Sequence, residues 1–116
     1  KPVVIEANRN DIEKVLKNYV VNNSLDAVIA LDTDASFAVY KVASELKKNI
    51  PKDIAVIGYM SEHIAPYLTP ELSTINQHSF TIGKMAAKML LEQLDSKENN
   101  NRTLVVDSTL SLRKSS

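Results

Sequence analysis

The chain has 116 residues, of which 44% are apolar and 24% charged, a composition typical of one globular domain with its own core. Fourteen basic residues balance fourteen acidic ones, so the charge does not indicate a surface for nucleic acid or for a membrane. The absence of cysteine excludes disulfides and thiolate metal sites, and no apolar run reaches the ~18 residues of a membrane-spanning helix. Because the chain opens on Lys1 and continues directly into an apolar run, we expect it to be cut from a longer protein.

The first half of the chain is predicted to alternate between strands and helices. Pro2–Ile5 and Ala27–Leu31 are apolar runs without alternation, which predicts strands buried on both faces. Asn10 and Glu13 have the spacing of a capping box and predict the start of a helix, whose apolar stripe is Ile12, Val15, Leu16, Tyr19 and Val20. A second helix is predicted over Asp34–Lys48, with a stripe of Ala35, Ala38, Val39, Val42, Ala43 and Leu46.

Two aromatic side chains lie off the stripe of this second helix. Phe37 and Tyr40 are three residues apart, so they form a separate apolar patch on the helix surface. A helix that packs through one face does not need such a patch. Either these side chains cover a neighbouring loop, or they meet another subunit.

Two further strands are predicted over Ile54–Gly58 and Ser73–Asn76, joined by a loop. Pro51 ends the segment before them, because its ring cannot continue a helix. Gly58 ends its strand where the backbone must turn sharply or let another group approach closely.

The last part of the chain is predicted to form a helix, a polar loop and two short strands. The helix covers Phe80–Asp95, with an apolar face at Ile82, Met85, Ala86, Met89, Leu90 and Leu94. Ser96–Arg102 is the polar loop, and the strands are Leu104–Asp107 and Leu110–Leu112. Strands that alternate with helices predict an α/β fold with a mainly parallel sheet and right-handed crossovers.

Several motifs occur in a fixed order from about Ala27 to the end of the chain. They are Pro51-x-Asp53-Ile54, Val56-Ile57-Gly58-Tyr59, Leu68-Thr69-Pro70-x-Leu72-Ser73-Thr74-Ile75-x-Gln77, Ile82-Gly83-Lys84-x-Ala86-Ala87 with Leu90-Leu91, and Leu112-Arg113-Lys114-Ser115. This set resembles the effector-binding core of the LacI/GalR family of bacterial repressors. The resemblance implies a three-layer α/β/α lobe of a periplasmic-binding-protein-like type I fold, whose two lobes close on a small effector. Residues 1–116 would be the C-terminal part of the effector-binding and dimerisation domain, without the DNA-binding headpiece or most of the first lobe.

Ligands of an open parallel sheet bind outside the carboxyl ends of its strands, which points to Glu6–Asn8, Leu31–Asp34 and Tyr59–Ser61. The effector contacts of the family fall at the same three places, and Gln77 matches a further cleft residue. The candidate ligand-binding residues are therefore Asn8, Leu31, Asp32, Tyr59, Met60 and Gln77. Asp32 and Asp34 also lie at a helix start, where a carboxylate satisfies free N–H groups, so capping is the alternative role.

Two of these positions depart from the family pattern. Many relatives that sense sugars or nucleobases have an acidic residue at the position of Met60 and a polar one at the position of Leu31. A carboxylate accepts hydrogen bonds from sugar hydroxyls, whereas a thioether barely does. The sequence therefore predicts a pocket that is more apolar than usual or that reads its ligand mainly from the other lobe.

No catalytic, metal or cofactor site is indicated. His63 and His78 lack metal-ligand spacing, and no nucleophile-elbow glycines surround Ser61. Gly58 and Gly83 are the only glycines, so there is no glycine-rich phosphate loop. We therefore expect that the protein is not an enzyme.

The resemblance places the Phe80–Asp95 helix in the first lobe. Its six apolar side chains are each worth ~1.5–3 kcal/mol when buried, so we expect the helix either to fold back on its own sheet or to dock on another copy, for example by domain swapping. The family also dimerises through the present lobe. The candidate interface, including the aromatic patch, is Ser36, Phe37, Tyr40, Ile64, Tyr67 and Leu68. The alternative for Ile64 and Tyr67 is that they only cover the sheet edge.

The resemblance implies the ligand-sensing and dimerisation module of a cytoplasmic, LacI-type transcriptional regulator. Its partners would be a small-molecule effector such as a sugar, a second copy of the chain, and DNA only through the headpiece. The alternative is the C-terminal lobe of a periplasmic sugar-binding transport protein. The motifs between Pro51 and Gln77 and the Arg113-Lys114-Ser115 ending favour the regulator.

Overall fold

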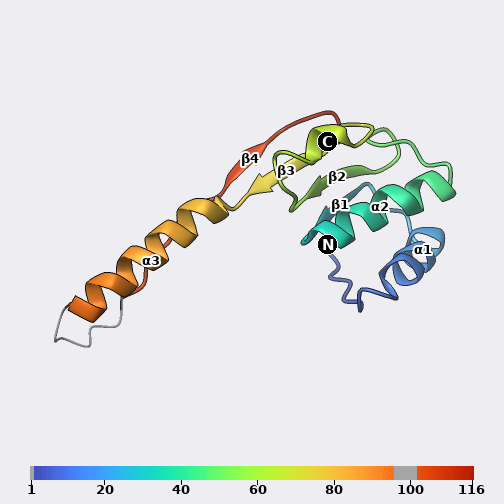
Figure 1. The fold of residues 1–116 in the computed structure, drawn as a ribbon. Coiled ribbons are helices and arrows are strands. Elements are labelled where there is room, and N and C mark those ends of the chain that lie inside the picture. Colours follow the sequence, from blue (N-terminus) through green and yellow to red (C-terminus); the bar gives the residue numbers. More distant parts are fainter. Residues whose placement is uncertain (1, 96–101) are drawn as a thin grey trace.

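A computed structural model describes residues 2–95 and 102–116 as a sheet with two packed helices and a third helix that projects away from it (Figure 1). In chain order the elements are α1 (Ile12–Asn22), β1 (Ala27–Ala30), α2 (Thr33–Glu45), β2 (Ala55–Gly58), the 3-10 helix η1 (Ala65–Tyr67), β3 (Ser73–Asn76), α3 (Ser79–Asp95) and β4 (Thr109–Ser111). The predicted order of the strands and helices from α1 to α3 is confirmed. No helix of the described part of the chain is long and apolar enough to cross a membrane.

The sheet has four strands in the order β1-β2-β3-β4. β1, β2 and β3 are parallel, with Val28 opposite Val56 and Gly58 opposite Thr74, whereas β4 runs antiparallel to β3. The predicted α/β fold with a mainly parallel sheet is therefore confirmed. The carboxyl ends of the three parallel strands meet at one edge of the sheet.

The core lies between this sheet and the helical layer of α1 and α2, which contact each other while α2 contacts β1 and β2. Its buried side chains include Leu16, Val20, Val39, Val42, Val56 and Leu72. Each is worth ~1.5–3 kcal/mol of burial, so this interface dominates the stability of the fold. Exposure alternates along β1, where Ala30 is buried and Ile29 is 61% exposed. Of the three layers expected, the described residues thus contain the sheet and one helical layer.

Gly58 is required by the close approach of α2 to β2. A Cβ atom at this position would lie 2.5 Å from Ser36 Oγ and 2.9 Å from Leu72 Cδ2. The sequence predicted either a sharp turn or a close approach of another group at this glycine, and the structure shows the close approach.

The prediction of a strand over Pro2–Ile5 is wrong. The segment is irregular, and Val3 and Val4 are 62% and 79% exposed. An apolar run forms a strand only when a neighbouring strand pairs with its backbone, and in the described residues β1 ends the sheet. The capping box is also absent, because Asp11 precedes α1 and makes no side-chain cap hydrogen bond.

The end of the chain differs from the prediction in a similar way. Leu104–Asp107 is irregular, and the last strand is Thr109–Ser111 rather than Leu110–Leu112. Arg102 forms an ion pair with Glu92 of α3 at 3.1 Å, so the returning chain starts beside this helix. Of the predicted loop Ser96–Arg102, residues 96–101 lie outside the described residues.

The 17-residue helix α3 points away from the sheet, and none of its residues is buried (Figure 1). Ile82, Leu90 and Leu94 of its apolar face are 45%, 57% and 73% exposed. The expectation that this helix folds back on its own sheet is therefore wrong. The molecule measures 60 × 27 × 26 Å because this helix extends it in one direction. Docking of the helix on another copy stays a prediction.

Candidate functional site

A hollow of about 620 Å³ lies at the carboxyl ends of β1, β2 and β3. Its walls are three segments that directly follow or end these strands, residues 31–33, 59–63 and 75–81. The crossover helices of a parallel sheet leave these ends open, which is why ligands of such sheets bind there. This hollow is the candidate site.

The structure brings five of the six predicted ligand-binding residues together. Leu31, Asp32, Tyr59, Met60 and Gln77 all line the hollow. Asn8 is not among the lining residues, because its segment is not held beside β1 as a strand. Instead, the Asn8 carbonyl accepts a hydrogen bond from the backbone of Asp11 at 2.9 Å, in the turn before α1.

The two acidic residues at the start of α2 have different roles. Asp32 caps the helix, since its Oδ1 accepts a hydrogen bond from the backbone N–H of Ala35 at 2.7 Å. Asp34 lies in the first turn, where a negative charge favours the helix dipole, but its carboxylate forms an ion pair with Arg9 at 2.8 Å. The N-cap residue is therefore Asp32, which combines the cap with a place in the wall of the hollow, whereas Asp34 faces the helix dipole without being the cap.

Met60 borders the hollow but is only 6% exposed and packs in the core with Ala65 and Leu72. The polar character of the walls comes from other residues. No ligand role was predicted from the sequence for Glu62 or Asn76. Both nevertheless line the hollow, together with the two histidines. Among the described residues, no group of three or more side chains forms a candidate metal site.

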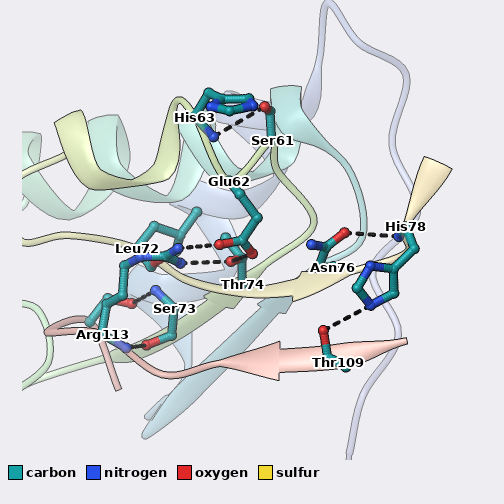
Figure 2. Close-up of polar contacts among 11 residues, drawn as sticks. Ser61, Glu62, His63, Leu72, Ser73, Thr74, Asn76, His78, Thr109 and Arg113 are labelled. Atoms are coloured by element: carbon teal, nitrogen blue, oxygen red, sulfur yellow. Dashed lines mark hydrogen bonds and ion pairs between the residues drawn. The ribbon is translucent and has the colours of Figure 1, made fainter. Parts of the chain in front are cut away.

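Glu62 is held by a polar cluster that lies over β3 (Figure 2). Thr74 donates to its Oε1 at 2.6 Å, and the Arg113 guanidinium forms an ion pair with its Oε2. Partial burial disfavours the ionised carboxylate, but hydrogen bonds from Thr74 and Arg113 and the Arg113 charge outweigh this and lower the pKa of Glu62. Arg113 also donates to the Leu72 carbonyl at 2.9 Å and to Thr74 Oγ1 at 2.7 Å. The carboxylate is thus kept charged and fixed in place.

The end of the chain joins β2 to β3 through a buried serine. Ser115 Oγ accepts from the backbone N–H of Ser73 at 2.8 Å and donates to the Val56 carbonyl at 2.6 Å. The Val56 N–H in turn donates to the Ser115 carbonyl at 2.7 Å. The only signal for this role in the sequence was the resemblance of the Arg113-Lys114-Ser115 ending to the family.

A second polar contact joins the points where the chain leaves for α3 and returns from it (Figure 2). His78 directly precedes α3 and has a positive φ of 52°. Its backbone N–H donates to Asn76 Oδ1 at 2.8 Å, and its ring Nε2 lies 3.0 Å from Thr109 Oγ1 of β4. The end of β3 and the start of β4 are thereby held together beside the hollow.

The predicted dimer residues do not all lie at the surface. Phe37, Ile64 and Tyr67 are 46%, 45% and 86% exposed, and Leu68 is half-buried. Tyr40 donates from its hydroxyl to the Pro70 carbonyl at 2.7 Å, so it covers the neighbouring loop, one of the two alternatives. Ser36 is fully buried against β2, where its hydroxyl donates to the Asp32 carbonyl, so its place in a surface interface was a wrong prediction.

The sheet topology and the position of the hollow define the class of protein: an α/β lobe with an open hollow at the carboxyl ends of its parallel strands. The chain matches the family model of the periplasmic binding protein-like domain over residues 2–116. The chain therefore belongs to this family, in the form found in LacI/GalR transcriptional regulators.

Individual relatives agree with this assignment. The chain is 35% identical over 89 residues to the ribose operon repressor of Haemophilus influenzae. The aligned region covers 77% of this chain and 27% of that protein. The chain is 41% identical over 73 residues to the HTH-type transcriptional repressor PurR of Edwardsiella ictaluri, covering 63% of this chain and 21% of that protein. The structure of a LacI family transcriptional regulator from Enterococcus faecium with bound ribose superposes with a TM-score of 0.80 at 26% identity, over 92% of this chain and 40% of that one. The chain thus spans about a quarter of the length of the curated relatives it matches.

Proposed function

We propose that the chain is the ligand-sensing and dimerisation module of a LacI-type transcriptional regulator that acts in the cytoplasm. The observation that carries the proposal is the hollow at the carboxyl ends of β1, β2 and β3, in which five of the six predicted ligand-binding residues meet. The relatives named above are repressors, which favours a regulator over the alternative, a lobe of a periplasmic transport protein. The same names favour a binding role over catalysis.

The walls of the hollow fit a small ligand with several hydroxyl groups. The carboxylates of Asp32 and Glu62 accept hydrogen bonds, whereas the amides of Asn76 and Gln77 both donate and accept. A sugar offers hydroxyls that do both, and the ring of Tyr59 provides an apolar surface for its carbon face. Because the regulator from Enterococcus faecium was solved with ribose, a pentose is the first ligand to test.

Ligand binding would control DNA through a shift between two arrangements of the lobes. A ligand shifts such an equilibrium only by its difference in affinity for the two states. The hollow borders residues 77–81, where the chain passes from the sheet into α3. A ligand that contacts both β3 and this passage would therefore favour one orientation of α3, and with it one spacing of the DNA-binding headpieces of a dimer.

The dimer surface would be formed by α2 and η1. Phe37, Ile64 and Tyr67 are exposed there, and large aromatic side chains are enriched at interfaces. The face of α3 is a competing surface for self-association, because it is apolar and unburied. The two surfaces can be distinguished by sedimentation equilibrium of the wild-type chain and of the variants Tyr67→Lys and Leu90→Glu. Loss of dimer by Tyr67→Lys alone supports the α2 and η1 surface, whereas a monomeric wild type refutes dimerisation of this chain.

The test of ligand sensing is a titration of the ¹⁵N-labelled chain with D-ribose, followed by amide chemical shifts. A half-open site binds weakly, and millimolar dissociation constants, about −4 kcal/mol, remain measurable in this way. We expect saturable shifts at Asp32, Tyr59 and Gln77. L-Ribose is the control, since it has the same groups in mirror-image order. Equal, non-saturable shifts with both enantiomers would refute sensing of a pentose at this site.

A further inference from the structure

The carboxylate that is missing at Met60 has a replacement two residues later. Two acidic residues line the hollow, Asp32 and Glu62, and Asp32 already uses one oxygen to cap α2. The Glu62 side chain is 29% exposed, whereas Met60 is turned into the core at 6% exposure. Glu62 is therefore the carboxylate of the second wall segment, residues 59–63, that a ligand in the hollow can reach.

The groups that hold Glu62 lie behind it rather than in the hollow. Thr74 is fully buried, the Arg113 side chain is 15% exposed, and neither is among the lining residues. Thr74 and Arg113 each donate to the carboxylate. A carboxylate has about four acceptor positions, so acceptor positions remain for a donor on the side of the hollow.

A donor lines the same hollow as this acceptor. Asn76 is two residues from Thr74 on β3, so their side chains lie on the same face of the sheet, roughly 7 Å apart along the strand. The His78 N–H donates to Asn76 Oδ1, which identifies the other amide atom as the nitrogen. Glu62 and the Asn76 amide nitrogen therefore offer an acceptor and a donor in the wall of the same hollow, and Figure 2 labels both side chains.

We propose that Glu62 and Asn76 form a specificity-determining pair that reads adjacent hydroxyl groups of a polyhydroxylated ligand. A hydroxyl donates one hydrogen bond and accepts others, so a vicinal diol satisfies a carboxylate and an amide N–H together. The proposal rests on the proposed function, because it names the chemistry that this hollow recognises. The alternative is a purely structural role, in which Glu62 serves only as the ion-pair partner of Arg113.

The test compares the D-ribose affinity of the wild-type chain with Glu62→Gln and Glu71→Gln, measured by amide chemical shifts. Glu71→Gln is the matched control, because Glu71 also pairs with a basic residue of the C-terminal segment, Lys114 at 2.7 Å, but does not line the hollow. We expect Glu62→Gln to raise the dissociation constant about tenfold or more, the usual effect of losing a hydrogen bond to a charged group, and Glu71→Gln to leave it within about twofold.

Deoxy sugars separate recognition from support of the fold. If Glu62 reads a hydroxyl, Glu62→Gln will bind either 2-deoxy-D-ribose or 3-deoxy-D-ribose as well as the wild type does, because the contact is already lost with that sugar. A merely structural Glu62 would weaken all three sugars by the same factor, which would overturn the proposal. Wild-type binding with no effect of Glu62→Gln overturns it as well but leaves ligand sensing intact, whereas a wild type that binds no ribose refutes the proposed function itself.

A second variant covers the case in which Glu62→Gln does not fold. Asn76→Asp keeps an acceptor for the His78 N–H but removes the donor toward the hollow. We expect a loss of ribose affinity of about tenfold, comparable to that of Glu62→Gln. Unchanged affinity of Asn76→Asp would overturn the pair.

Discussion

Ser115→Ala is the sharpest test of how the C-terminal segment holds the sheet together. The hydroxyl of Ser115 is fully buried and satisfies two backbone groups, the N–H of Ser73 and the carbonyl of Val56. In a strand, the N–H and carbonyl of one residue point to the same side. Because the Val56 N–H bonds the Ser115 carbonyl, the Val56 carbonyl also faces this segment and not β1. Alanine therefore removes the buried side-chain partner of both groups.

The expected cost follows from these two groups. Each lost hydrogen bond costs about 0.5–1.5 kcal/mol, so the loss of two should lower the free energy of unfolding by about 1–3 kcal/mol. A domain of this size has a total stability of about 5–15 kcal/mol, so the loss is large enough to measure. Urea denaturation followed by circular dichroism gives the change as a shift of the midpoint at constant slope.

The matched control is Ser44→Ala, because Ser44 is an exposed serine of α2. We expect this control to stay within about 0.5 kcal/mol of the wild type, as is usual for surface substitutions. A loss of less than about 0.5 kcal/mol for Ser115→Ala, with an unchanged slope, would refute the reasoning. It would mean that another donor or water replaces the hydroxyl.

Three further predictions concern packing, a loop contact and pH. Gly58→Ala should lower the free energy of unfolding by about 1–3 kcal/mol in urea denaturation, because its Cβ would overlap Ser36; an unchanged midpoint would show that α2 can move aside at no cost. Tyr40→Phe should lower the free energy of unfolding by about 0.5–1.5 kcal/mol in the same assay, because the hydrogen bond to the Pro70 carbonyl is lost. Burial raises the pKa of the Tyr40 phenol, so spectrophotometric titration should detect a phenol that ionises above pH 10.0 in the wild type and is absent from the variant. Since the pKa of Glu62 is lowered below 4.5 in the fold, its ionised form stabilises the protein above that pH, and this is lost as pH falls through the lowered value. The stability difference between wild type and Glu62→Gln, measured by urea denaturation, should therefore be larger at about pH 7 than at about pH 3, and an equal difference at both would contradict this.

Some of these features could be read directly from the sequence. The apolar stripes predicted α1 and α2, because a helix that packs on a sheet must repeat its apolar residues with the helical period. The bounds of β3 were predicted correctly, and the rule for parallel sheets pointed to the wall segments of the hollow after β1 and β2. These are local patterns or general rules of topology, so they need no knowledge of which segments meet.

What only the tertiary structure decided is which groups come together. Pro2–Ile5 has the pattern of a buried strand but no strand pairs with it, and the apolar face of α3 finds no sheet to cover in the described chain. Glu62 and Arg113 are 51 residues apart, and their ion pair depends on the register of β3 against β4. Hydrogen bonds and ion pairs act over a few ångströms, so partners distant in the sequence are set by the packing of the whole chain. For this reason the sequence pointed to the edge of the sheet where the hollow lies, and only the fold brought the Glu62 carboxylate into its wall.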